Sequence, residues 1–194
     1  MKQKSTPTDT QDLLLDRVNF ASPTFSLSNR LRRALWLLAW ALLASWTPPP
    51  AHRWRIALLR LFGANVSWKA SVYRSVKIWA PWHLTMADYA CLGPGVTVYN
   101  IELVRLETKA VVSQGAHLCT GTHDHRDPAF PLYARPIHVG AQAWICAESF
   151  VGPGVAIGDG AVLAARGVAF KSLESWRVYL GNPAVEHSRR SVRD

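Results

Sequence analysis

Aliphatic side chains recur at every sixth position in the second half of the chain. Between residues 137 and 170 they fall at Val139, Ile145, Val151, Ile157 and Leu163, and a small residue follows each of them. Neither an α-helix, with a period of about 3.6 residues, nor an amphipathic strand, with a period of about 2, produces this spacing. The spacing therefore predicts a chain that coils as a triangular prism, with one short strand on each side and three hexads in each turn.

The same register continues toward the N-terminus. It fits three earlier sets of aliphatic residues, the first of them less regularly: Val66, Val72 and Ile78; Met86, Leu92 and Val98; and Leu106, Val112 and Leu118. Inward-facing residues of successive coils are expected to stack at strand spacing, about 4.8 Å apart. Extra residues enter after the third hexad of each early coil, so they are predicted to project from one corner of the prism. The longest insertion, 124–136, is predicted to form a protruding loop.

A different pattern precedes the repeat. Residues 31–46 are apolar nearly throughout, and Pro48–Pro50 follow, which predicts a helix that begins near Ser28–Asn29. Sixteen residues are fewer than the roughly 20 that span a bilayer. The helix can cover the open end of the solenoid, which is the preferred interpretation. Its arginines and tryptophans also suit a membrane interface, so peripheral membrane contact through residues 31–46 is the alternative.

The formal net charge of +9 is concentrated at the N-terminal end. Residues 1–60 contain nine Lys/Arg and three Asp/Glu, a net +6, whereas 61–136 carry +2 and 137–194 carry +1. No nucleic-acid-binding motif accompanies this charge, so nucleic acid is not an expected partner. The three cysteines form no CxxC pair, and the first sixteen residues lack the apolar core of a secretory signal. A cytoplasmic location is expected, with association at the inner face of the membrane as an open possibility.

The repeat, the inserted loop and several motifs resemble the left-handed parallel β-helix acyltransferases. Within these, the chain is most similar to the colanic acid biosynthesis acetyltransferases, relatives of the maltose and nodulation-factor O-acetyltransferases. The upstream segments that carry the resemblance are "LRRALW" and "WRIALLRLFGANV". The others are "KIWAPWHL", "VVSQGAHLCTGTHDHRDPAFPL", "RPIHVGAQAWICAESFVGPGVAIGDGAVL" and "WRVYLGNPA". The resemblance covers roughly residues 25–186.

The resemblance implies a mainly β protein in three parts. These are an N-terminal arm with apolar and basic helices (1–62), a left-handed parallel β-helix of hexapeptide repeats (63–170) with the inserted loop, and a C-terminal segment with the GNPA motif and a basic tail (171–194). It also implies a homotrimer with active sites at the subunit interfaces. The implied reaction moves acetyl from acetyl-CoA to a hydroxyl of a sugar or lipid-linked glycan, in exopolysaccharide or envelope glycan biosynthesis.

Acetyl transfer to a hydroxyl needs a base, and an imidazole with a pKa near 6.5 suits that task. In the resembling enzymes the histidine after a small residue at this point is the general base, and Thr122–His123 matches it. Asp124 or Asp127 is expected to orient the ring. Asn100 and Asp127 are the candidates for contact with the acceptor.

The resemblance places the pantetheine arm of coenzyme A in a groove between adjacent β-helices. The residues expected along this groove are small, aromatic or basic: Trp144, Cys146, Gly158, Ala164, Ala165 and Lys171. No metal is expected.

Two other functions are considered. Carbonic anhydrases share this fold and bind zinc through three histidines, which His83, His117 and His123 could supply. A non-catalytic scaffold that trimerises a membrane helix is the third possibility. The GNPA segment and the loop after His123 favour the transferase.

Overall fold

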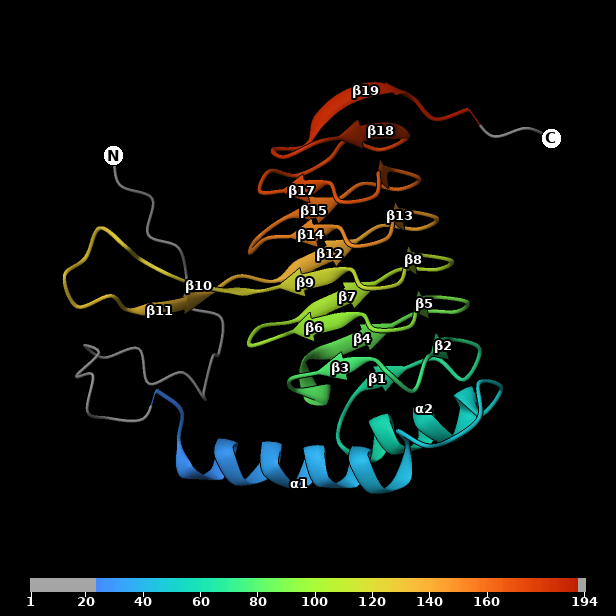
Figure 1. Cartoon of the computed structure of the whole chain (residues 1–194), viewed down its shortest axis with the longest axis vertical. Helices are drawn as coiled ribbons and strands as arrows, with labels where there is room; N and C mark the ends of the chain where they lie inside the picture. Colours follow the sequence, from blue (N-terminus) through green and yellow to red (C-terminus); the bar gives the residue numbers. More distant parts are fainter. Residues whose placement is uncertain (1–23, 192–194) are drawn as a thin grey trace.

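The computed structural model describes residues 24–191, so residues 1–23 of the predicted arm and 192–194 of the predicted tail lie outside the described part. Three sheets of short parallel strands form the sides of a prism (Figure 1). The first sheet contains β1 (Asn65–Val66), β4 (Leu84–Met86), β7 (Val104–Leu106), β12 (Ile137–Val139) and β15 (Ala156–Ile157). The second contains β2 (Ser71–Val72), β5 (Cys91–Leu92), β8 (Val111–Val112), β13 (Trp144–Ile145), β16 (Val162–Leu163), β18 (Arg177–Leu180) and the antiparallel β19 (Val185–Arg189). The third contains β3 (Lys77–Ile78), β6 (Thr97–Tyr99), β9 (His117–Cys119), β14 (Phe150–Val151) and β17 (Val168–Ala169).

The predicted stacking of inward residues is confirmed. Val66 pairs with Met86, and Leu106 pairs with Val139 across the longest insertion. Most inward side chains are fully buried, so they form one continuous core along the axis. All three insertions follow strands of the third sheet, at the corner between the third and first sheets.

The β-helix extends past residue 170, where the sequence pattern predicted its end. Leu173 bridges to Ile157, and β18 pairs with β16 in the parallel direction. Leu173 and Tyr179 are buried and complete a further partial coil. The C-terminal segment is therefore part of the solenoid as far as Leu180.

Two helices cover the open end of the prism beside the first coil (Figure 1). α1 (Leu27–Leu43) begins after Ser26, whose side chain accepts a hydrogen bond from the Asn29 N–H. The Trp36 side chain is 1 % exposed, and its Nε1–H donates to the Ile78 carbonyl at 2.8 Å. α2 (His52–Leu61) buries Ile56 and Leu59 against the same coil. No helix within residues 24–191 is long and apolar enough to cross a membrane.

Candidate active site

The predicted protruding loop is a β-hairpin. Its strands, β10 (Gly121–His123) and β11 (Leu132–Ala134), pair antiparallel and leave the prism at the corner between the third and first sheets (Figure 1). Thr120 anchors the departure, because its buried hydroxyl donates to the Tyr99 carbonyl and accepts from the Glu102 N–H, both at 3.0 Å. A Cβ on Gly121 would lie 2.5 Å from the Ile101 side chain, which explains the glycine at this exit.

His123 lies at the end of β10 with its imidazole exposed to solvent. Its Nδ1 is 2.9 Å from the Phe130 carbonyl oxygen, and the two rings stack with centroids 4.4 Å apart and planes 9° from parallel. A carbonyl oxygen can only accept, so Nδ1 carries the proton and Nε2 keeps a free lone pair. The hairpin therefore holds the imidazole in the tautomer that a general base requires.

The prediction that a carboxylate orients His123 is wrong. The Asp124 carboxylate accepts from the Arg126 N–H at 3.0 Å, and the Asp127 carboxylate accepts from the Ala129 N–H at 2.8 Å. Both aspartates therefore stabilise turns of the hairpin tip, which is a common use of this short side chain. Sequence reasoning missed Phe130 because every residue carries a carbonyl, so no side-chain type marks the one that binds the ring.

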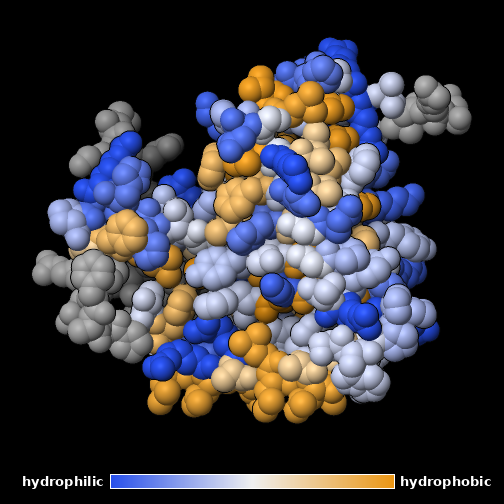
Figure 2. Space-filling model, in the orientation of Figure 1, coloured by the Kyte–Doolittle hydropathy of each residue, from blue (hydrophilic) through white to orange (hydrophobic). Residues whose placement is uncertain are grey.

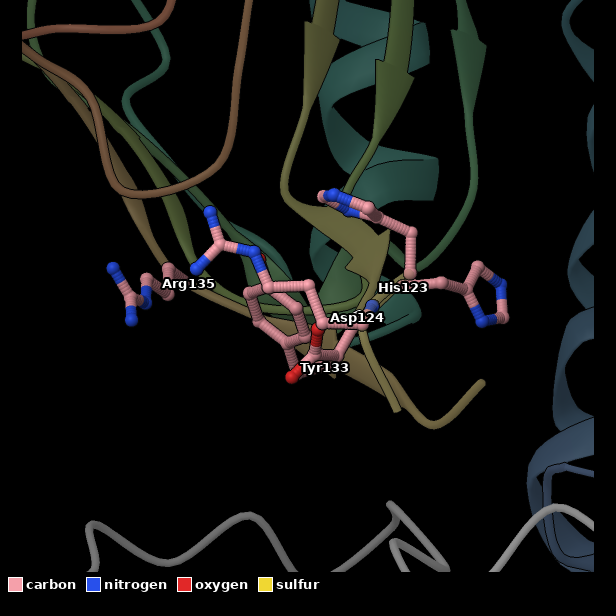
Figure 3. A pocket seen from close by; sticks show the side chains of 6 residues that line it. His123, Asp124, Tyr133 and Arg135 are labelled. Atoms are coloured by element: carbon pink, nitrogen blue, oxygen red, sulfur yellow. Dashed lines mark hydrogen bonds between the residues drawn. The ribbon is translucent and has the colours of Figure 1, made fainter. Parts of the chain in front are cut away.

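An open pocket of about 440 Å³ lies along the hairpin (Figure 3). Its lining residues are His123, Asp124, His125, Arg126, Tyr133 and Arg135. The lining includes the guanidinium groups of Arg126 and Arg135 but only one carboxylate, that of Asp124, so the pocket favours a ligand with an anionic group.

Asn100 does not reach this pocket, which corrects its predicted contact with an acceptor. The side chain is 0 % exposed. Its amide nitrogen donates to the carbonyls of Ala80 and His83, and its oxygen accepts from the Ala80 N–H. Asn100 therefore joins two successive insertions at the corner, as a buried amide with satisfied hydrogen bonds.

The residues predicted to bind the cofactor lie at three corners rather than along one surface of the chain. Cys146, Ala164 and Ala165 follow second-sheet strands, and Lys171 follows β17, at the corner from which the hairpin departs. Gly158 follows β15, at the corner between the first and second sheets, and Trp144 is the first residue of β13, next to that corner.

Gly158 was predicted to line the cofactor groove, but it also allows two coils to pack closely. A Cβ at this position would lie 2.5 Å from the Ser175 nitrogen, so the glycine admits the next coil. Trp144 is 45 % exposed, and its Nε1–H donates to the Ser113 hydroxyl at 2.8 Å. Its indole face is therefore available to a ligand.

The three histidines of the zinc alternative do not meet within the chain. His83 lies in the turn η1 (Pro81–His83), with Nδ1 3.4 Å from the Asn100 carbonyl. His117 packs edge-on against Phe150, and burial lowers its pKa. Within the described part of the chain, no three His, Cys, Asp or Glu side chains form a group that could hold a metal ion.

Comparisons with known proteins agree on the fold and the class of enzyme. No family model matches the chain. The Escherichia coli strain K12 protein named as colanic acid biosynthesis acetyltransferase WcaF is 42 % identical over 171 residues, covering 88 % of this chain and 94 % of its own length. The Shigella flexneri protein of the same name gives the same values.

Two solved structures share the fold at low sequence identity. A maltose O-acetyltransferase from Clostridium difficile 630 aligns with a TM-score of 0.75 at 17 % identity, over 86 % of this chain and 90 % of that one. The hexapeptide-repeat acetyltransferase VCA0836 of Vibrio cholerae, complexed with acetyl-CoA, aligns with a TM-score of 0.75 at 19 % identity, over 93 % and 97 %. The predicted left-handed β-helix of hexapeptide repeats is confirmed.

Proposed function

The chain belongs to the family of colanic acid biosynthesis acetyltransferases, and from this premise we propose that it moves the acetyl group of acetyl-CoA to a sugar hydroxyl, with His123 as the general base. The single observation that carries the residue assignment is the Nδ1–H bond from His123 to the Phe130 carbonyl, because it leaves Nε2 free beside the pocket.

The chemistry follows from this tautomer. The acceptor hydroxyl oxygen attacks the thioester carbonyl carbon while Nε2 of His123 takes the hydroxyl proton. The tetrahedral intermediate then collapses, the carbon–sulfur bond breaks, and the imidazolium returns the proton to the leaving thiolate. Stacking on Phe130 holds the ring, so little reorientation precedes proton transfer.

The acceptor in this proposal is a sugar or lipid-linked glycan of an exopolysaccharide or envelope glycan. The name of the WcaF relative supports this class. Arg126 and Arg135 further favour an acceptor that carries a carboxylate or phosphate near the reacting hydroxyl. One oxygen of Asp127 accepts the Ala129 N–H, and contact between its carboxylate and the acceptor stays a prediction.

A homotrimer is part of the proposal. The His123 pocket is open on one chain, so a neighbouring subunit would supply its missing wall. Phe150 and Phe170 pack together on the outer surface of the third sheet, and Phe170 is 63 % exposed, which suits a subunit contact. Trp144 and Lys171 would then reach acetyl-CoA across the interface, each from its own corner.

The test compares His123→Ala with His187→Ala, a control at an exposed histidine on β19. Calorimetric titration measures acetyl-CoA binding, and mass spectrometry measures acetylation of a panel of sugars that includes uronates and sugar phosphates. We expect both variants to bind acetyl-CoA and His123→Ala to lose about 10²–10⁴-fold in transfer. Unchanged transfer by His123→Ala would refute the base assignment. Stoichiometric zinc without acetyl-CoA binding would favour the lyase instead.

A further inference from the structure

The helix α1 presents an apolar face on its outer side as well as its inner one. The inner stripe, which includes Trp36 and the partly buried Ala39 and Trp40, packs on the core of the first coil. The opposite stripe contains five leucines at helical spacing that are between 56 % and 66 % exposed: Leu27, Leu31, Leu35, Leu38 and Leu42. A helix on a water-exposed surface normally carries polar residues there, so these leucines are unusual.

Two tryptophans extend this stripe beyond the end of α1. Trp46 is 68 % exposed and Trp54 is 51 % exposed. Their Nε1–H groups donate to the carbonyls of Leu42 and Leu43, at 2.7 and 2.6 Å. The polar atoms of both indoles are satisfied within the protein, while the rings remain exposed. We call the five leucines and two tryptophans the foot surface. Figure 2 shows hydrophobic residues gathered along the lower edge of the molecule.

All the Lys, Arg, Asp and Glu residues in the part of the chain around the foot surface are basic ones. Residues 24–87 contain nine Lys/Arg and no Asp or Glu. Arg30 and Arg53 are exposed, while the guanidinium groups of Arg32 and Arg33 each lie 3.9 Å from a tryptophan ring centroid. The first acidic residue after position 24 is Asp88, whose carboxylate is 2.8 Å from the Lys69 ammonium.

We propose that the foot surface binds an anionic lipid bilayer, with α1 lying in the plane of the interface. Leucine and tryptophan side chains bury in the headgroup–acyl boundary, and the surrounding arginines meet lipid phosphates. A second copy of the chain fits this surface poorly, because contact between two foot surfaces would bring two basic ends together, and residues 24–87 supply no carboxylate to neutralise them. The inference does not depend on the acetyltransferase assignment.

The geometry of the fold gives this binding mode a consequence for the site. α1 lies across the N-terminal end of the solenoid, roughly perpendicular to the solenoid axis (Figure 1). With α1 in the plane of the interface, the solenoid axis would therefore point away from the membrane. The hairpin leaves after β9, two coils above β3, which is about 10 Å along the axis at strand spacing. The His123 pocket would then face the glycan of a lipid-linked acceptor rather than its lipid.

The experiment measures co-sedimentation of the full chain with vesicles. Phosphatidylglycerol–phosphatidylcholine vesicles are compared with vesicles of phosphatidylcholine alone, over a series of salt concentrations. One variant combines Leu31→Gln, Leu35→Gln and Leu38→Gln, because glutamine nearly matches leucine in helix propensity. A second combines Arg30→Glu with Arg53→Glu. The matched control, Val185→Gln with Arg189→Glu, changes exposed residues of β19 at the other end of the solenoid.

We expect the wild type and the control to bind the anionic vesicles, and added salt to weaken this binding. The leucine variant should bind at least about tenfold more weakly. The arginine variant should lose about fivefold for each arginine. Thermal melting and circular dichroism check that every variant is folded.

The proposal fails if the wild type does not sediment with anionic vesicles at low salt, or if the leucine variant binds as well as the control. It also fails if the wild type does not bind vesicles and the leucine variant has a smaller mass than the wild type by light scattering. That last result would make the foot surface a contact between subunits.

Discussion

Arg55 fastens the helical end of the molecule to the β-helix, and replacing it is expected to loosen that end selectively. It lies in α2, is 0 % exposed, and has no carboxylate partner among the ion pairs of residues 24–191. Its Nε–H donates to the Val72 carbonyl at 2.6 Å, and one Nη donates to the Thr47 hydroxyl at 2.8 Å. The guanidinium also donates to the carbonyls of Pro48 and Pro49, so one side chain joins α2, the turn before it and the first coil.

The magnitude for Arg55→Met follows from the acceptors left behind. The Thr47 hydroxyl is buried, and a buried acceptor that loses its donor costs about 1–3 kcal/mol. The Val72 carbonyl keeps a donor, because His52 Nδ1 lies 2.9 Å from it and can replace the guanidinium. Pro48 and Pro49 are exposed, so water can replace the guanidinium at their carbonyls. Burial lowers the pKa of Arg55, which reflects a desolvation cost that methionine does not have. We expect a net loss of about 1–3 kcal/mol, or about 2–12 °C in Tm.

Differential scanning calorimetry and hydrogen exchange read out the effect. Exchange should accelerate in residues 24–62 and stay slow in the coils of residues 137–170. Arg55→Lys should lose most of the same stability, because a single ammonium group cannot reproduce the guanidinium fork. The control, Arg74→Met at an exposed position, should change stability by less than about 0.5 kcal/mol. A Tm of Arg55→Met within about 2 °C of the control, or uniform loss of protection along the chain, would refute this account.

Three further outcomes follow from single contacts. Phe130→Ala removes a ring stack with His123 that is worth about 0.5–1.5 kcal/mol. We therefore expect kcat to fall about 2- to 13-fold while the KM for acetyl-CoA stays unchanged. Equal kcat values for the variant and the wild type would show that Phe130 does not position His123. Burial lowers the pKa of His117, so the unfolded chain takes up a proton first as the pH falls below about 6.5, and the free energy of unfolding decreases. Urea titrations should show a weaker pH dependence for His117→Phe, and identical curves would contradict this. Gly160→Ala places a Cβ 2.5 Å from the Trp176 ring, whereas a Cβ on Gly95 would lie 3.8 Å from the Gly115 nitrogen, an ordinary contact distance. Both glycines have positive φ, so denaturation should show a greater loss of stability for Gly160→Ala than for Gly95→Ala, and equal losses would rule out the clash.

In the candidate site, the sequence predicted the position of the histidine but not the group that orients its ring. Placing His123 at the mouth of an inserted loop required only the hexad register and the motif around it. The group that orients its ring is a backbone carbonyl of Phe130, seven residues further along the hairpin. The carboxylates of Asp124 and Asp127 accept backbone N–H groups in turns of the hairpin tip. The pairing of β10 with β11 therefore determines which acceptor binds the imidazole.

The end of the β-helix was missed for a similar reason. From Ile157 to Leu173, and from Leu163 to Tyr179, the stacked residues are 16 apart rather than 18. This two-residue deletion breaks the period, although the side chains still fill the same interior. A periodic pattern in the sequence can show only coils of constant length, whereas the packed core accepts any segment that returns an apolar side chain to the axis.

By itself, the sequence determined the number and register of the regular coils and the corner from which the insertions project, because each hexad repeats a local requirement for one inward aliphatic residue. It also determined that a short apolar helix precedes them. Only the tertiary structure decided which side chains meet across coils. It buried Asn100 within a corner, separated the predicted cofactor residues among three corners, and turned one face of α1 onto the core while leaving its leucines outside. These outcomes depend on where the chain returns after each insertion, and that position is set by packing between segments far apart in sequence.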